Sequence, residues 1–415
     1  MRPPPTVLRR ALLDPVWLLL GTAMAVVLLA IAAVAGLAAP LTRRRRPLRL
    51  ALFGALYLAV DVCLVAGCAV VWLRHPVAGR RDQARRSRLH AAMLCRALSV
   101  LIGAAGPLLG FRVEVQEPPD TGLIAGSPLL VLARHGGPGD SFALVHLLMT
   151  RYQRRPLIVL AETLRWDPGL DVLLGRLPCC FIRQGNGAKM ASRLTELARR
   201  MERDDAILLF PEGGNWTPRR HRHAIVRLRR AGRRQAAADA ESNPNVLPPR
   251  SPGVLACLAG RPELGVAIVA HTGLEDLVSP AAIWRALPVQ GRPMTVRWWY
   301  EPAGAVPEAD EDRRAWLRLQ WAIMDSWIDA RKAARDDPLA AGLSAAGTLR
   351  RILPAGWVHR RVGGGAPPAR LADPAARAAG GCDGRAERGR QAARRHVHHL
   401  HGRDADRDAD RARHS

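Results

Sequence analysis

Aromatic and acidic residues are scarce in this chain. Its 415 residues include 3 tyrosines and 5 phenylalanines beside 11 tryptophans. Proteins that read single-stranded RNA stack its bases on exposed aromatic side chains, so this composition argues against such a platform. Lysine and arginine number 62 against 36 acidic residues, a formal net charge of +26. So basic a chain is expected to work beside an anionic surface, with nucleic acid and anionic lipid as the two candidates.

Two further absences limit the chemistry. The 7 cysteines include no Cys-x-x-Cys pair, and an odd, scattered set favours a reducing compartment over a disulfide framework. No serine or cysteine stands in a Gly-x-Ser-x-Gly turn, so a hydrolase triad is not supported.

Two long apolar runs begin the chain. Val16–Ala39 contains no charged residue, and Leu50–Leu73 contains only Asp61. Each run has about 24 residues, enough at ~1.5 Å per residue to cross a hydrocarbon core of about 30 Å. We therefore predict an N-terminal transmembrane helical hairpin within residues 1–80, with helices at about 16–39 and 50–73. A cleaved signal peptide is the alternative for the first run only.

The arginines around these runs bear on the orientation of the hairpin. Nine arginines flank the pair of runs and five lie in the connector, which favours both ends in the cytoplasm. A hairpin that dips into one leaflet would satisfy the same charges. We expect Asp61 to form a hydrogen bond across the hairpin or to lie near a water-accessible face, rather than to act as an intramembrane functional group. The shorter apolar run at Ala91–Phe111 is predicted to be an interfacial helix.

Strand-like and helix-like segments alternate after this region. The strand-like runs are Leu129–Ala133, Leu157–Ala161, Cys179–Arg183, Ala206–Phe210, Gly265–Ala270 and Met294–Tyr300. This alternation predicts an α/β domain over residues 81–340, with a mixed, largely parallel sheet flanked by helices. Asp312–Arg335 is predicted to be a terminal amphipathic helix with an apolar packing stripe.

The last segment, residues 341–415, is predicted to be a basic disordered tail, because its Ala, Gly, Arg, Asp and Pro composition offers too little apolar surface to fold. Its histidines, from His396 to His401, lack partner ligands in register. We therefore expect no metal site there.

The segment Val131–His146 carries the first chemical motif. An apolar strand-like run ends at Arg134, and a Gly-Pro-rich turn separates His135 from Asp140. A neutral imidazole can take a proton from a hydroxyl, and a carboxylate fixes its tautomer and stabilises the imidazolium. We therefore interpret His135 as a general base and Asp140 as its partner. Asp140 also suits a helix N-cap, and both roles can coexist.

The second motif lies at Ile207–Arg220, where a strand-like run leads into Pro211-Glu212-Gly213-Gly214 and a group of arginines. A glycine-rich turn can present backbone N–H groups to an anion, and the arginines supply positive charge. The alternative is a strand-ending turn followed by a basic, solvated or lipid-facing helix.

Together the two motifs resemble the glycerolipid acyltransferase superfamily, which includes the 1-acyl-sn-glycerol-3-phosphate acyltransferases and other lysophospholipid acyltransferases. The family's His-x4-Asp block corresponds to His135–Asp140, and its Phe-Pro-Glu-Gly block to Phe210–Gly213. A Phe-x-x-Arg segment between them is approached in compressed form at Cys179–Arg183. The resemblance covers about residues 91–330, with its blocks in the family's order.

Three segments depart from the family pattern. The first block contains Gly136–Gly139 where many members carry a serine or glutamine and bulkier residues. The usual Thr-Arg after Phe-Pro-Glu-Gly is Gly214-Asn215, so that phosphate-binding arginine is missing. The strand Gly265–Ala270 lacks the usual proline. The missing charge would come from Arg183, Arg219, Arg220 or Arg250.

The resemblance implies direct acyl transfer, with His135 and Asp140 as the catalytic pair. The substrate-binding residues it implies are Arg183, Phe210, Pro211, Glu212, Gly213, Gly214, Arg219 and Arg250. The donor would be acyl-CoA or acyl-carrier protein, used as co-substrate, and neither a metal nor a redox cofactor is required. The acceptor would be a membrane lysophospholipid, 1-acyl-sn-glycerol-3-phosphate in the first instance, with phosphatidic acid as product. The enzyme would act on the cytoplasmic face of the cytoplasmic membrane, without a specific nucleic-acid partner.

Two alternatives remain at this point. One is an acyltransferase for a non-phosphate lipid acceptor, an amino-lipid or glycolipid, which Asn215 keeps open. The other is a membrane-anchored basic adaptor with a degenerate acyltransferase fold, against which the intact His135, Asp140 and Glu212 argue.

Overall fold

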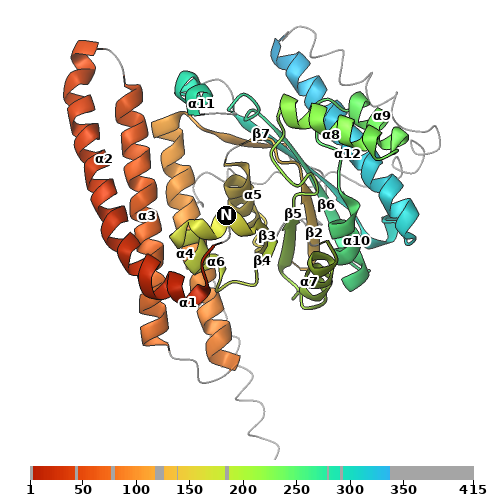
Figure 1. The fold of residues 1–415 in the computed structure, drawn as a ribbon, viewed down its shortest axis with the longest axis horizontal. Helices are drawn as coiled ribbons and strands as arrows, with labels where there is room; N and C mark the ends of the chain where they lie inside the picture. Colours follow the sequence, from red (N-terminus) through yellow and green to blue (C-terminus); the bar gives the residue numbers. More distant parts are fainter. Residues whose placement is uncertain are drawn as a thin grey trace, which may run out of the picture. The chain divides into compact units, whose positions relative to one another are not determined.

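The computed structural model describes residues 3–42, 45–75, 80–116, 126–137, 139–182, 187–277, 280–289 and 293–336. Long N-terminal helices are followed by a sheet with helices on both of its faces (Figure 1). The predicted α/β class, with a mixed and largely parallel sheet, is confirmed. The predicted tail at 341–415 and the predicted substrate residue Arg183 lie outside the described residues.

The sheet has seven strands in the order β1-β7-β6-β2-β5-β3-β4. They are β1 (Val113–Gln116), β2 (Leu129–Ala133), β3 (Arg155–Ala161), β4 (Cys180–Ile182), β5 (Asp205–Leu209), β6 (Gly265–Thr272) and β7 (Met294–Glu301). All neighbouring strands run parallel except β6 and β7, which are antiparallel. The sequence did not indicate β1, because this short edge strand is only partly buried and shows no apolar run.

The central strand β2 contributes to a separate core on each face of the sheet. Leu129 and Val131 pack on the side of α5 and α6, whereas Leu130 and Leu132 pack on the side of α7, α10 and α12. The bounds of these helices are α5 (Asp140–Thr150), α6 (Pro168–Leu174), α7 (Gly187–Arg199), α10 (Ser251–Gly260) and α12 (Asp310–Asp336). Burial on both faces explains why the strand is an unbroken apolar run.

The C-terminal helix α12 confirms the predicted amphipathic helix. Its apolar stripe, Trp316, Leu317, Trp321, Met324 and Ile328, is buried in the second core. The stripe therefore packs inside the protein and does not face lipid. The remaining helices of this part of the chain are α8 (Pro218–Arg230), α9 (Arg234–Ser242) and α11 (Pro280–Ala286).

The N-terminal part contains α1 (Thr6–Leu8), a π-helical turn (Arg9–Leu13), α2 (Asp14–Thr42), α3 (Arg46–Arg74) and α4 (Arg80–Leu109). By length and composition, three helices in the described residues are able to cross a membrane: Thr6–Thr42, Arg46–Arg74 and Asp82–Leu109. The helix predicted at Ala91–Phe111 thus begins earlier, because arginine favours helix and the basic segment before Ala91 continues it.

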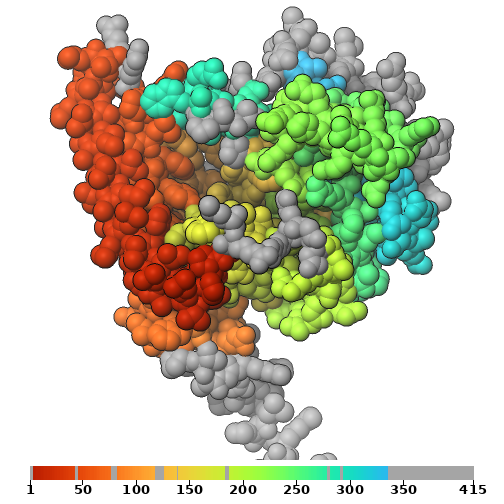
Figure 2. Space-filling model, viewed as in Figure 1, coloured from red at the N-terminus to blue at the C-terminus, as the bar shows by residue number. Residues whose placement is uncertain are grey.

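The outer side of α2 carries many exposed apolar side chains. They include Val16, Leu19, Leu20, Met24, Val26, Val27, Leu29, Ile31, Val34, Leu37 and Leu41. The helix lies at the edge of the described part, away from the sheet (Figures 1 and 2). A contiguous apolar surface of this kind marks a site of interaction with a membrane or another protein.

Helix α6 packs against the N-terminal helices near the middle of α3. The indole of Trp17 donates to Asp61 at 2.5 Å, which confirms the predicted hydrogen bond of Asp61 across the hairpin. A Cβ atom at Gly169 of α6 would collide with the Asp61 carboxylate. Tyr57 donates its hydroxyl to Asp167, the N-cap of α6, at 2.7 Å. Polar contacts therefore attach α6 to the hairpin halfway along its length.

A buried ion cluster strengthens this attachment. Asp171 of α6 is 1% exposed and lies 2.9 Å from Arg9 Nε, 3.0 Å from an Arg10 nitrogen and 3.1 Å from Arg165. Removing one partner of such a buried pair typically costs about 3–5 kcal/mol, because the other charge is left without compensation. The cluster thus fixes the start of the chain against α6.

Candidate active site

His135 and Asp140 meet where β2 ends and α5 begins. His135 Nδ1 lies 2.8 Å from Asp140 Oδ2. Gly139, between them, has a φ of 85°, a left-handed conformation that glycine adopts without strain. This turn brings the imidazole back over the first residue of the helix. The structure therefore brings the two predicted catalytic residues together.

Asp140 is a buried carboxylate with several N–H donors. It accepts from the backbone of Gly136 at 2.9 Å, Gly137 at 3.3 Å and Ser141 at 2.6 Å. Gly139 is the N-cap and Asp140 the first helical residue, so the carboxylate binds the turn before the helix rather than capping it. Burial alone would raise the pKa of Asp140, but the hydrogen bonds from His135 and a second histidine hold it well below its usual range. An ionised Asp140 keeps the proton on Nδ1 of His135 and leaves Nε2 free to accept one.

The Phe210–Gly214 turn lies directly beside His135. The backbone N–H of Trp216 donates to the His135 carbonyl at 2.6 Å. The Phe210 ring packs on the imidazole with a centroid distance of 4.7 Å. Because β2 and β5 are parallel neighbours, with Leu132 opposite Leu209, both motifs emerge at the same edge of the sheet.

Glu212 lies behind His135, with its carboxylate turned into the protein. It is 3% exposed and accepts from the backbone N–H of His135 at 3.2 Å and Leu247 at 3.3 Å, and from the indole of Trp321 at 3.2 Å. Glu212 therefore connects the histidine turn to α12 and to the segment before α10.

Arg250 and Arg220 lie against this turn. Gly213 has a φ of 71°, and a Cβ atom there would lie 3.0 Å from Arg250 Cζ. The Arg250 backbone N–H donates to the Pro211 carbonyl at 2.9 Å, and Arg220 donates to the Asn215 carbonyl at 3.1 Å. Burial and the neighbouring Arg227 lower the pKa of Arg250. Arg219 lies on the exposed first turn of α8 and is not in the group around Gly213.

The match to a family model agrees with this site. Residues 112–249 match the family model described as Acyltransferase, and this range includes His135, Asp140 and the Phe210–Gly214 turn. The segment is an acyltransferase domain. Among solved structures, the chain is similar to the 1-acyl-sn-glycerophosphate acyltransferase PlsC from Thermotoga maritima. The identity is 15% and the TM-score 0.42, over 70% of this chain and 98% of that chain. No curated protein sequence matches the chain.

A buried polar layer that the sequence did not indicate connects this domain to β6 and the loop after it. Arg134, with no exposed surface, binds the His271 carbonyl at 2.8 Å and Glu275 at 2.9 Å. Burial would raise the pKa of Glu275, but Arg134 and the backbone N–H of Gly273 bring it down to about 2. His271 ends the apolar run of β6, and in a parallel sheet a polar residue at that place joins the one that ends β2. The signal available in the sequence was therefore the polar residue that ends each of these two apolar runs.

Two glycines of the first block are required by this layer. A Cβ atom at Gly136 would lie 2.8 Å from His271 Cε1, and one at Gly137 would lie 2.6 Å from the Leu274 carbonyl oxygen. Real Cβ atoms do not approach other atoms so closely. The departure of this block from the family pattern therefore follows from how β6 and its loop pack on it.

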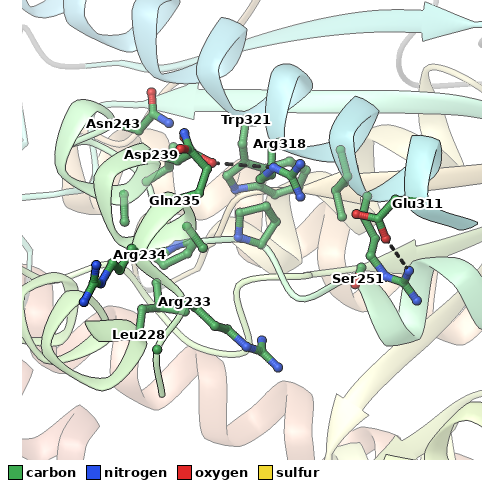
Figure 3. A pocket seen from close by; sticks show the side chains of 18 residues that line it. Leu228, Arg233, Arg234, Gln235, Asp239, Asn243, Ser251, Glu311, Arg318 and Trp321 are labelled. Atoms are coloured by element: carbon green, nitrogen blue, oxygen red, sulfur yellow. Dashed lines mark hydrogen bonds and ion pairs between the residues drawn. The ribbon is translucent and has the colours of Figure 1, made fainter. Parts of the chain in front are cut away.

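A cavity of about 580 Å³ lies between α9, the segment before α10 and α12 (Figure 3). Two ion pairs cross its lining, Arg318–Asp239 at 3.5 Å and Arg314–Glu311 at 3.0 Å. Its lining includes Trp321 but not His135 or Asp140. The cavity thus borders Trp321, which binds Glu212, and is separate from the His135–Asp140 pair. Within the described ranges, no group of three or more His, Cys, Asp or Glu side chains is arranged to hold a metal ion.

The buried carboxyl of Glu212 should make the stability of the acyltransferase domain depend on pH. Burial raises its pKa from 4.5 to about 7. Between these values the unfolded chain has lost this proton and the folded chain retains it, so rising pH destabilises the fold, by up to about 3 kcal/mol. We expect Glu212→Gln to flatten the fall in melting temperature between pH 5 and pH 7.5, measured by thermal unfolding in detergent.

Glu263 provides the matched control, because its side chain is 65% exposed in an ion pair with Arg261. Glu263→Gln should leave the slope of melting temperature against pH as in the wild type. Equal slopes for Glu212→Gln and the wild type would contradict a raised pKa.

Proposed function

We propose that the chain is a membrane-associated acyltransferase that moves a fatty acyl group from a thioester to the hydroxyl of a lysophospholipid. The observation that carries this is the His135–Asp140 pair, joined at 2.8 Å at a sheet edge, with His135 still 23% exposed. The proposed acceptor is 1-acyl-sn-glycerol-3-phosphate and the product is phosphatidic acid. The donor is acyl-CoA or acyl-carrier protein, which enters as co-substrate.

The reaction needs one proton carrier. The acceptor hydroxyl gives its proton to His135 Nε2 as its oxygen attacks the thioester carbonyl carbon, forming a tetrahedral oxyanion. The C–S bond then breaks, the ester forms, and the thiolate takes the proton from His135. Asp140 stabilises the imidazolium between the two steps. The N–H groups of Gly136 and Gly137 already bind Asp140, so the oxyanion donors lie elsewhere in the site.

Arg250 is the proposed partner of the acceptor phosphate. Its guanidinium packs on Gly213, next to the turn that contacts His135, and a charge there replaces the arginine missing at Asn215. We expect Arg250→Ala to raise the KM for the phosphorylated acceptor about tenfold, equivalent to about 1.4 kcal/mol, with the KM for the donor unchanged.

The control for this variant is Arg230→Ala, an exposed arginine in the last turn of α8. It removes one positive charge from the same region without touching Gly213. An acceptor KM unchanged in Arg250→Ala would contradict the assignment. An equal rise for an acceptor without phosphate would also contradict it.

The hairpin is proposed to bring the acyltransferase domain to the cytoplasmic face of the cytoplasmic membrane, where a lipid acceptor and a cytosolic thioester meet. The attachment of α6 halfway along α3, through Asp61 and Gly169, favours a hairpin that enters one leaflet. A spanning hairpin would place this polar contact at the centre of the bilayer, at a high energetic cost.

An acceptor panel tests the proposed function. The full chain, purified in detergent and returned to phospholipid vesicles, is assayed with radiolabelled acyl-CoA, and in parallel with radiolabelled acyl-carrier protein, against lysophosphatidate, lysophosphatidylcholine and a lyso-glycolipid. Preferred acylation of lysophosphatidate is expected. Preference for the glycolipid would favour the non-phosphate alternative, which the Gly214-Asn215 sequence supports. No transfer to any acceptor, from either type of donor, would contradict an enzymatic function and favour the adaptor.

A further inference from the structure

A second histidine lies beside the proposed catalytic pair. In the parallel pairing of β2 and β6, Ala133 lies opposite Val269. His135 and His271 each follow two residues after that pair, so both emerge at the same edge of the sheet. His271 has no exposed surface, whereas His135 is partly open to substrates. The buried imidazole of His271 is therefore placed to support His135 rather than to contact a substrate.

His271 contacts the same carboxylate oxygen as His135. Its Nε2 lies 3.4 Å from Asp140 Oδ2 and 3.2 Å from the Arg134 carbonyl oxygen. Both are acceptors, so Nε2 carries the hydrogen and donates to them. Its Nδ1 has no hydrogen-bond partner among the residues described, which suits the unprotonated nitrogen of a neutral ring, since a buried N–H without an acceptor is costly.

We propose that His271 is a positioning residue that holds the Asp140 carboxylate and moderates the negative charge that Asp140 presents to His135. The inference rests on the proposed function, in which His135 is the general base. The N–H of His271 and that of His135 both contact Asp140 Oδ2. Hydrogen bonds to an ionised group strengthen that group's preferred orientation. Two imidazoles thus contact one carboxylate. His135 exchanges the proton, and His271 fixes the orientation of the Asp140 anion.

The neighbouring glycine supports this role. The ring of His271 occupies the space that a side chain at position 136 would need, since a Cβ there would lie 2.8 Å from Cε1. Gly136 also donates its N–H to Asp140 Oδ2 at 2.9 Å. The glycine and the second histidine therefore form one arrangement around the same oxygen, and a larger residue at 136 would displace the ring.

The charged groups around His271 determine the direction of its effect. Asp140 and His135 face it from the first block, Arg134 from the end of β2, and Glu275, paired with Arg134 at 2.9 Å, from the loop after β6. Without the His271 N–H, the full charge of Asp140 would act on His135. A stronger anion stabilises the imidazolium and keeps it protonated to higher pH. Loss of His271 should therefore reduce the fraction of active base at neutral pH.

The test compares His271→Phe, which keeps a ring without the donor, with His271→Gln, which restores an N–H. For His271→Phe we expect kcat to fall about tenfold at nearly constant KM, and the acidic limb of the kcat profile to move to higher pH. His271→Gln should recover most of both. His221→Phe is the control, because the Nε2 of that buried histidine binds the Ala240 carbonyl, at 2.9 Å; it should lower the melting temperature without moving the limb.

A His271→Phe variant with unchanged kcat and an unchanged acidic limb would overturn the proposal. The titration of His135, followed by NMR of ¹⁵N-labelled histidine, gives a readout independent of acyl transfer. It still applies if the wild type fails the acceptor panel. If His271→Phe does not fold, Gly136→Ala, which displaces the ring, takes its place. A His135 midpoint that moves upward supports the coupling, and an unmoved midpoint refutes it.

Discussion

His135→Ala should abolish acyl transfer, lowering kcat by a factor of about 10⁴, the upper range for loss of a general base. The hydroxyl of a lysolipid is a weak nucleophile, and the imidazole is the partly exposed base held 2.8 Å from a buried carboxylate. Its removal leaves Asp140 facing the substrate without a ring to carry the proton. The measurement is acylation of lysophosphatidate by the variant in vesicles, at saturating donor.

Folding and membrane association should survive this change. The apolar side of α2 and the ion cluster at Asp171 are separate from His135. His223→Ala, an exposed histidine on α8, serves as control and should retain full activity. Wild-type turnover in membranes that carry His135→Ala would eliminate the mechanism.

Asp140→Asn should have the second largest effect, a fall in kcat of about 10³ to 10⁴. Asp140 Oδ2 accepts from His135 and Gly136, and Oδ1 accepts from Ser141. An asparagine has one oxygen and one NH₂ group. If the NH₂ group faces His135, it donates to Nδ1 and moves the ring proton to Nε2, which then cannot take a proton from the acceptor. If it faces Ser141, the partly buried backbone N–H of Ser141 loses its acceptor.

Either orientation also costs stability, about 1–3 kcal/mol for an unsatisfied buried group. Asp205→Asn is the matched control, since Asp205 is 1% exposed in an ion pair with Arg155 and lies at the start of β5, at the other end of the strand from the site. It should lower the melting temperature and leave kcat of the folded fraction unchanged. Equal kcat losses in the two variants would mean that the effect of Asp140 is structural.

Much of the fold was predictable because its local patterns are strong. Six of the seven strands, the hairpin helices and α12 each produce an apolar run or stripe that survives in the structure. The start of α4 was misplaced, because hydropathy locates the apolar segment and not the arginine-rich helical turn before it. The edge strand β1 was missed, because its four residues, Val113–Gln116, alternate between apolar and polar over a length too short to form an apolar run.

The candidate site was only partly predictable. His135, Asp140 and Phe210–Gly213 follow from the order and spacing of two motifs, and the structure brings them together. Arg250 was named as one of several basic residues, and only its packing on Gly213 distinguishes it from Arg219. The position of Arg183 lies outside the described residues and stays a prediction. The burial of Glu212 could not be inferred, because it depends on Trp321, which lies far along the chain.

The sequence by itself determined the long apolar N-terminal helices, the α/β class and the presence of a His-x4-Asp block before a Phe-Pro-Glu-Gly block, because these are local patterns of hydropathy and residue type. The tertiary structure decided which groups surround that chemistry. It brought His271 to Asp140 and Trp321 to Glu212, and packed α6 against the middle of α3. These contacts depend on strand register and helix packing between segments distant in sequence, and no local pattern encodes them.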